Sequence, residues 1–160
     1  MTATGARTNH LSPRRAAGAR EDVSLPDVIS RILLEFKILA VVGLSAKPSR
    51  PSHGVSAYMR AHGYRVIPVN PNIESVLNER CYSSLEEVPG PIDVVVIFRK
   101  PEHVLEIVEA AIQKRARVIW MQEGIRNQKG ARRAREAGLE VVEDRCILKE
   151  HAKRFVTEGI

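Results

Sequence analysis

Short apolar runs of strand length recur along the chain, separated by longer segments of mixed polarity. The runs are rich in valine and isoleucine, which favour strands, and residues 92–98 are nearly continuous in these two residues. A run of that kind is typical of a strand buried on both faces of a sheet. The pattern predicts five strands, at residues 38–43, 64–69, 92–98, 118–120 and 139–142.

In the intervening segments, apolar residues recur at helical spacing. The clearest case is residues 101–114, where Val104, Ile107, Val108 and Ala111 fall on one face of a helix. The pattern predicts helices that begin near residue 24 and that span residues 52–62, 101–114 and 127–137, with short helices near residues 84–88 and at the end of the chain.

Strands and helices therefore alternate from residue 38 onward, which requires a parallel sheet with helices packed against it. We expect an α/β fold of the Rossmann-like type, a doubly wound and mostly parallel five-stranded sheet with helices on both faces. At 160 residues the chain has room for one such domain, which we place at residues 23–160.

The first part of the chain, residues 1–22, differs in composition from the rest. Residues 1–20 contain four arginines and no acid, without apolar periodicity, so we expect a disordered basic tail. The whole chain has a formal charge of +6, but beyond residue 20 it carries 21 basic against 19 acidic residues. The predicted domain therefore lacks the concentrated positive charge of a nucleic-acid-binding domain.

The lengths of the apolar runs and the number of cysteines both give information about the cellular compartment of the protein. No apolar run reaches the roughly 18–20 residues needed to cross a membrane. Cys81 and Cys146 are too few for a disulfide framework and have no CxxC spacing, which fits a reducing compartment. We expect a cytoplasmic protein. The arginine-rich, acid-free tail also matches a mitochondrial transit peptide, and this alternative stays open.

Polar and basic residues gather in the turn after the first predicted strand. Gly43 allows the backbone to approach a ligand closely, and Ser45 and Ser52 offer hydroxyls near a helix start, where free N–H groups favour an anion. Lys47 and Arg50 add positive charge, and the turn contains no carboxylate. These residues predict a site for a phosphate-bearing, nucleotide-like ligand. A capped helix start with two solvated bases is the alternative.

Two common phosphate-binding signatures are missing from this turn. It contains neither the G-x-G-x-x-G fingerprint nor the P-loop pattern. The second strand ends in Asn70 and Pro71, where NAD-binding folds place an acid for the ribose hydroxyls. The sequence therefore argues against ordinary NAD binding and against P-loop hydrolysis.

Five segments, in chain order, carry a resemblance to a known family. They read VVGLSAKPSRPSHGV at 41–55, GYRVIPVNP at 63–71, IDVVVIFR at 92–99, VIWMQEGI at 118–125 and VVEDRC at 141–146. Together they resemble the small stand-alone CoA-binding proteins, whose fold is similar to the CoA-binding domain of the succinyl-CoA ligase α subunit. Nothing in the chain resembles the phosphohistidine segment of those ligases.

The resemblance implies a binding site for coenzyme A. The residues that it places around the phosphates are Gly43, Ser45, Lys47, Arg50 and Ser52. Further along the sheet edge it implies Asn70 and Pro71 beside the adenine or ribose, Phe98 and Arg99 along the nucleotide or the start of pantetheine, and Gln122 and Gly124 along the rest of the groove.

We therefore expect a non-enzymatic protein that binds CoA or an acyl-CoA, as a monomer or a homo-oligomer. The sequence shows no recognisable set of a nucleophile, a general base and a residue that orients the base. We therefore assign no catalytic residue and no metal ligand. One alternative is an NADP- or acyl-CoA-dependent enzyme that uses Cys146 and His151. Another is an interaction module that binds nucleic acid through the basic tail.

Overall fold

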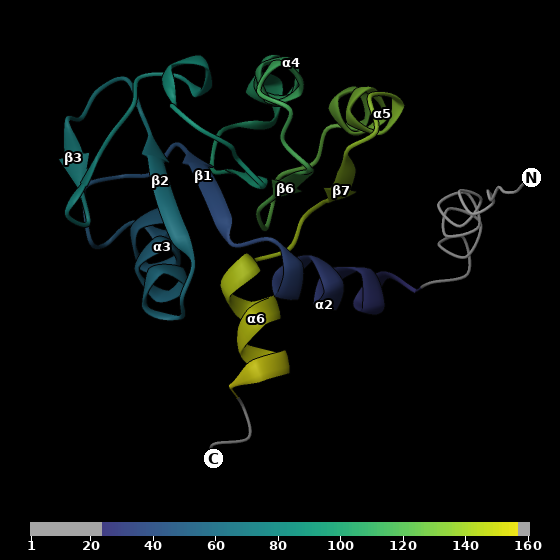
Figure 1. Cartoon of the computed structure of the whole chain (residues 1–160), viewed down its shortest axis with the longest axis horizontal. Coiled ribbons are helices and arrows are strands. Elements are labelled where there is room, and N and C mark those ends of the chain that lie inside the picture. Colours follow the sequence, from purple (N-terminus) through teal and green to yellow (C-terminus); the bar gives the residue numbers. More distant parts are fainter. Residues whose placement is uncertain (1–23, 157–160) are drawn as a thin grey trace, which may run out of the picture.

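The computed structural model describes residues 24–156. Within them, five parallel strands form one sheet in the order β2-β1-β5-β6-β7 (Figure 1). This arrangement confirms the predicted Rossmann-like, doubly wound sheet, although several predicted elements are shorter in the structure. The strands are β1 (Ile38–Val42), β2 (Arg65–Val69), β5 (Val94–Ile97), β6 (Val118–Met121) and β7 (Glu140–Val142).

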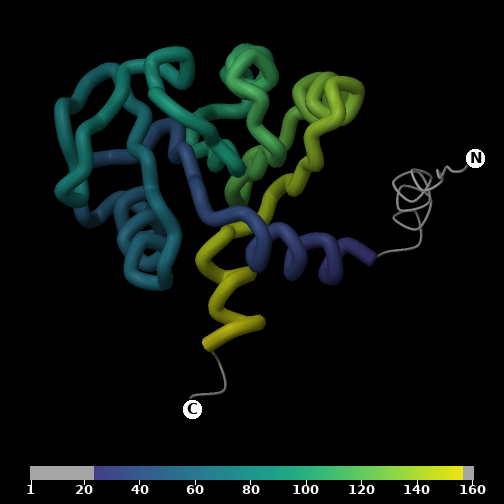
Figure 2. Tube along the Cα trace, in the orientation of Figure 1, coloured from purple at the N-terminus to yellow at the C-terminus, as the bar shows by residue number. Residues whose placement is uncertain are grey.

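Helices cover both faces of this sheet, as the sequence pattern predicts. One face packs against α2 (Leu25–Glu35), α3 (Pro51–Ala61) and α6 (Ile147–Phe155), and the other against η2 (Leu85–Glu87), α4 (Val104–Gln113) and α5 (Gln128–Glu136). Figure 2 shows α2 and α6 side by side although they lie at opposite ends of the described chain. No helix within residues 24–156 is long and apolar enough to cross a membrane.

Strand β5 shows how the apolar pattern produces the two layers. Successive side chains of a strand point to opposite faces. Val95 and Ile97 accordingly join the core under α4 and α5, whereas Val94 and Val96 join the core under α2, α3 and α6. All four are at most 1% exposed, so both faces of the central strand are buried, as its continuous run of Val and Ile predicts.

Two local features depart from the predicted elements. The helix predicted at residues 101–114 begins as a 3₁₀ turn, η3 (Pro101–His103), and becomes α4 at Val104. Between β2 and η2 the chain forms a small antiparallel hairpin of β3 (Ser75–Val76) and β4 (Glu79–Arg80). Strands of two residues are too short to show an alternating pattern, so the sequence did not predict the hairpin.

Candidate functional site

The candidate site lies where the order of the strands reverses. From β1 the chain moves to β2 on one side of the sheet, and it later returns to β5 on the other side of β1. The connections that leave the carboxyl ends of β1 and β5 therefore diverge and leave a crevice between them. In open α/β sheets this is the place where ligands bind.

Gly43 follows β1 directly and packs closely against the end of β5. Its φ is +94°, and a Cβ atom added there would lie 2.6 Å from the carbonyl oxygen of Phe98. No larger residue fits this position without displacing the backbone. Its N–H donates to the carbonyl of Val69 at 2.9 Å, so this one residue connects the ends of β1, β2 and β5.

Serine hydroxyls shape the loop that leads from Gly43 into α3. The hydroxyl of Ser52 is buried in the first turn of α3 and accepts a hydrogen bond from the N–H of Ser45 at 2.9 Å. The hydroxyl of Ser45 in turn accepts from the N–H of Lys47 at 3.0 Å. Both hydroxyls therefore fold the loop. Lys47 and Arg50 are exposed on it, and neither forms an ion pair with any residue between 24 and 156.

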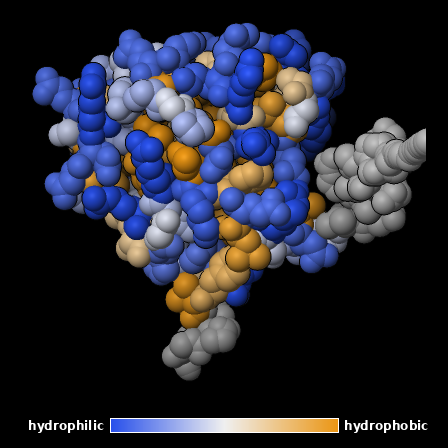
Figure 3. Space-filling view, viewed as in Figure 1, coloured by the Kyte–Doolittle hydropathy of each residue, from blue (hydrophilic) through white to orange (hydrophobic). Residues whose placement is uncertain are grey.

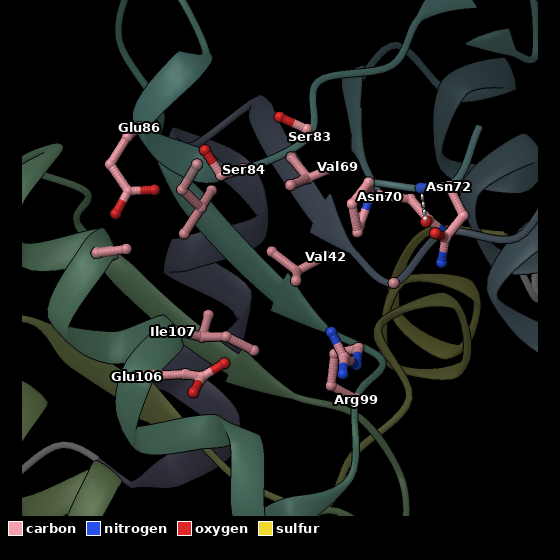
Figure 4. A pocket seen from close by; sticks show the side chains of 14 residues that line it. Val42, Val69, Asn70, Asn72, Ser83, Ser84, Glu86, Arg99, Glu106 and Ile107 are labelled. Carbon is pink, nitrogen blue, oxygen red and sulfur yellow. Dashed lines mark hydrogen bonds between the residues drawn. The ribbon is translucent and has the colours of Figure 1, made fainter. Parts of the chain in front are cut away.

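The amide of Asn70, at the end of β2, fixes the same loop from the other side. Its Nδ2 donates to the carbonyl of Leu44 at 3.0 Å, and its Oδ1 accepts from the N–H of Asn72 at 2.8 Å (Figure 4). An aspartate could not make the first of these bonds, because a carboxylate has no donor. The choice of Asn at the end of the second strand therefore has a structural reason.

A cleft of about 680 Å³ opens beside Gly43 and Asn70. Its apolar part comes from strand ends and from the facing sides of η2 and α4, and its polar part comes from the turns at its rim. Figure 4 shows Glu106 and Ile107 of α4 on one side of the cleft, with Asn70 and Asn72 on the other. The lining residues are Val42, Gly43, Val69, Asn70, Pro71, Asn72, Ser83, Ser84, Leu85, Glu86, Arg99, Glu106, Ile107 and Ala110.

Charge is distributed unevenly around the cleft. Arg99, which follows β5, is the one basic residue among the lining residues, and it lies next to Gly43 at the start of the cationic loop. Glu86 and Glu106 line the part of the cleft formed by η2 and α4. The cleft therefore offers a positive end, an apolar middle and an end with two carboxylates.

The structure brings only some of the residues predicted for the site into the cleft. Gly43, Asn70, Pro71 and Arg99 line it. Ser45, Lys47 and Arg50 lie on the adjoining loop, and Ser52 lies in the first turn of α3. Phe98 contributes its backbone carbonyl behind Gly43. A ligand role for each of these residues remains a prediction.

Gln122 and Gly124 lie outside this lining and have partners within the protein. The side chain of Gln122 is 4% exposed, and its Oε1 accepts from the N–H of Ile147 at 3.0 Å, at the start of α6. The N–H of Gly124 donates to Oδ1 of Asp144 at 2.6 Å, a contact that lowers the pKa of this aspartate. Both residues therefore join the end of β6 to the segment that leads into α6.

The sequence analysis missed two parts of the cleft lining, the segment that leads from β4 into η2 and the facing side of α4. Ser83, Ser84 and Glu86 come from the segment that was predicted only as turns and a short helix, and Glu106 and Ile107 come from a helix assigned only to packing. The one signal in the sequence for this part of the lining was the pair of adjacent serines before the short helix. Serine is common at the start of a helix, where its hydroxyl can lie at the polar edge of a cleft.

Cys146 and His151 also lie outside the lining of the cleft. Cys146 is a free, buried thiol at the start of α6. The Nδ1 of His151 is 2.8 Å from the hydroxyl of Tyr58, and among residues 24–156 no hydrogen bond joins this histidine to Cys146. No group of three or more His, Cys, Asp or Glu side chains in that range could hold a metal ion.

Comparison with known proteins places this geometry in a family. Residues 37–152 match the family described as "CoA binding domain". A Bacillus subtilis protein, "Uncharacterized protein YneT", is 43% identical over 124 residues, which cover 78% of this chain and 92% of that protein. The Archaeoglobus fulgidus "Acetate--CoA ligase [ADP-forming] II" is 30% identical over 97 residues, but these cover 59% of this chain and only 14% of the ligase.

Solved structures show the same fold in proteins of similar size. A "hypothetical protein from Pyrococcus horikoshii OT3" is 41% identical with a TM-score of 0.79, covering 83% of this chain and 93% of that one. A Thermus thermophilus protein, "cell-free ID.343", is 34% identical with a TM-score of 0.79, covering 82% of this chain and all of that one.

Proposed function

The chain belongs to the CoA-binding domain family, and from this premise we propose that it binds coenzyme A or an acyl-CoA along the carboxyl edge of its sheet, without catalysing a reaction on it. The observation that carries the proposal is the continuity between the cleft and the cationic loop. Gly43 both lines the cleft and begins the loop that carries Lys47 and Arg50. One extended ligand can therefore contact both.

The two ends of the cleft suggest how such a ligand lies. Phosphates are repelled by Glu86 and Glu106 and attracted by Arg99 and the loop, so we place them at the Gly43 end. The apolar middle then receives the adenine, and its exocyclic amine, a hydrogen-bond donor, faces the carboxylate end. In this orientation the phosphates of an ADP-like ligand lie beside basic residues, and its adenine lies against apolar side chains.

The proposal involves no chemical step on the ligand. Three of the relatives are acetate–CoA ligases, but this chain corresponds to at most 29% of the length of any of them. We therefore propose that this protein shares with the ligases the part that holds CoA, and that it acts as a carrier, sensor or regulator.

A thermal-shift titration with CoA, dephospho-CoA and NADP tests the ligand. A ligand that binds only the folded state raises stability by about 2.7 kcal/mol at a hundredfold excess over its Kd. We expect the largest shift with CoA, a smaller one with dephospho-CoA, which lacks the 3′-phosphate, and none with NADP. A shift with NADP but not with CoA overturns the proposal in favour of redox chemistry.

Two arginine variants test the position of the phosphates. Arg99→Gln removes the cation beside Gly43, and we expect it to weaken CoA binding by at least about tenfold, since a hydrogen bond to a charged group contributes about 1.5–3 kcal/mol. Arg65→Gln removes an exposed arginine at the first residue of β2, the end of this strand that lies away from the cleft. This variant should bind CoA like the wild type. Equal affinity in both variants would contradict our placement of the phosphates.

The nucleic-acid alternative depends on the tail at residues 1–22, which lies outside the described residues. Deletion of residues 1–20 tests it directly. Our proposal expects the truncated protein to bind CoA unchanged. If the full chain binds nucleic acid with a strong salt dependence and the truncated chain does not, the tail has this second role.

A further inference from the structure

A cluster of aromatic and basic side chains lies between α6 and α3, and neither the cleft nor the loop uses it. We name it the histidine cluster: His151 and Phe155 of α6, Tyr58 of α3, His62 directly after α3, Tyr64 before β2 and Lys37 before β1. Its central residue is His151, which is 7% exposed.

The rings around His151 enclose it from several elements. The ring centroids of His62, Tyr58, Tyr64 and Phe155 lie between 5.0 and 5.6 Å from that of His151. Its Nδ1 is 2.8 Å from the hydroxyl of Tyr58. The neutral ring therefore has a polar partner and largely aromatic surroundings, which suits a buried uncharged histidine.

The same surroundings disfavour a charged His151. Burial, together with the positive charges of His62 and Lys37, lowers the pKa of His151 below its usual range. Among residues 24–156, no carboxylate hydrogen-bonds to the ring or forms an ion pair with it. The nearest acid along α6, Glu150, pairs instead with Arg154, Lys153 and Arg145.

The two phenols of the cluster do not titrate in the range where His151 does. Burial raises the pKa of Tyr64 to about 12 and also raises that of Tyr58, so both phenols stay neutral at physiological pH. His62 is exposed after the end of α3, with its Nδ1 2.8 Å from the carbonyl oxygen of Tyr58.

We propose that His151 makes the packing of α6 on α3 sensitive to pH, so that α6 is held at neutral pH and released by acidification. Because His151 is only 7% exposed, a protonated imidazole gains hydration when α6 separates from α3. Phe155, the last residue of α6, is 43% exposed, and Val156 after it is 40% exposed. Figure 3 shows apolar surface on the part of the molecule where α6 lies. Release of α6 would expose more apolar surface. The proposed release does not depend on CoA binding.

Hydrogen exchange of the α6 amides measures the release, with protection factors corrected for the intrinsic effect of pH. A group whose pKa is lowered by folding stabilises the folded state above the unfolded pKa, about 6.5 for histidine. Between that value and the lower folded pKa, the opening equilibrium of α6 should increase by up to about tenfold per pH unit. Amides of α4 should keep their protection over the same range.

His151→Gln should abolish this pH dependence, because glutamine does not titrate but can still accept from Tyr58. His103→Gln is the matched control, since His103 lies at the start of α4, away from the cluster. The control should open like the wild type. If His151→Gln and the wild type show the same pH dependence, the proposal is wrong.

NMR titration of the wild-type histidines keeps the test independent of whether the variant folds. The His151 ring should titrate below about pH 6.5, and His62→Gln should move its midpoint upward by removing a positive neighbour. A His151 midpoint at or above 6.5, or one that does not respond to His62→Gln, overturns the proposal.

Discussion

At the scale of single residues, the polar side chains of the candidate site form hydrogen bonds within the protein. The hydroxyls of Ser45 and Ser52 and the amide of Asn70 all have partners within the protein. These side chains fix the shape of the loop, on which Lys47 and Arg50 are exposed. A preformed loop loses less conformational entropy on binding than a flexible one.

Gly43 allows a sharp test at this scale. Gly43→Ala places a Cβ against the Phe98 carbonyl and forces a side chain into positive φ, so we expect a loss of at least about 1–2 kcal/mol in the free energy of unfolding. CoA binding should fall with it, because the ends of β1 and β5 must move apart. Urea unfolding and the CoA thermal shift measure the two effects.

Gly54→Ala is the control for this change. Gly54 lies inside α3 without positive φ, and a Cβ atom added there would meet nothing within 4 Å beyond its own helix. Alanine there should raise stability by about 0.5–1 kcal/mol, through its better helix propensity, and leave binding intact. If both substitutions had the same effect, the close approach at Gly43 would not matter.

At the scale of elements, several turns use residues other than glycine in left-handed conformations. Leu77 and Asn78 have φ values of +54° and +60° at the turn of the β3–β4 hairpin. Arg115 has a φ of +60° and follows Lys114, the C-cap of α4, at the position where helices commonly end in glycine. These positions carry a local strain that the rest of the fold offsets.

Arg115 offers the simplest way to remove such strain. Arg115 is exposed, so Arg115→Gly should raise the free energy of unfolding by about 0.5–1 kcal/mol without loss of packing. Arg132→Gly, which removes an exposed arginine from the middle of α5, should instead lower it by about 1 kcal/mol. Urea unfolding distinguishes the two, and a loss of stability in both would show that the Arg115 side chain makes a contribution of its own.

At the scale of the whole molecule, α6 at the end of the described chain contacts both α2, at its beginning, and the end of β6 in the sheet. Glu150 of α6 is 6% exposed and lies 2.7 Å from Nη1 of Arg154, whose Nε donates to the hydroxyl of Ser30 in α2. At the other end of α6, Gln122 holds its first turn to the end of β6. Packing on this face of the sheet therefore depends on charge as well as on apolar burial.

Glu150 gives this charge network a pH dependence separate from that of His151. Burial raises the pKa of Glu150, but the hydrogen bond from Arg154 and the charges of Lys153 and Arg154 outweigh it and lower the pKa. A lowered carboxylate pKa stabilises the folded state above the unfolded value, near 4.5, and this stabilisation is lost as the pH falls through the folded value.

Glu150→Gln should therefore cost about 1–3 kcal/mol at pH 7, and its difference from the wild type should shrink below about pH 4.5. Urea unfolding from pH 7 to pH 3 follows this difference. Glu136→Gln, on the exposed side of α5, should match the wild type at every pH. A constant difference for Glu150→Gln across the range would show that its charge has no part in the effect.

The sequence by itself determined the layers of this protein, because apolar periodicity is a local property. The Val and Ile run of β5, buried on both faces, and the stripe of α4 follow from residue spacing alone. The turn after β1 likewise showed its chemistry locally, through a glycine, hydroxyls and two cations within ten residues. The five quoted segments identified the family from the same local information.

Only the tertiary structure decided which residues share the cleft. Glu106 and Ser84 lie on different elements and line the same cleft as Asn70, because η2, α4 and β2 come together at one edge of the sheet. Gln122 and Gly124 lie at the expected edge of the sheet, but the path of the chain into α6 gives their polar groups internal partners. The histidine cluster also joins residues far apart in the chain. Contacts of this kind depend on how the elements pack, and no pattern within a single segment records them.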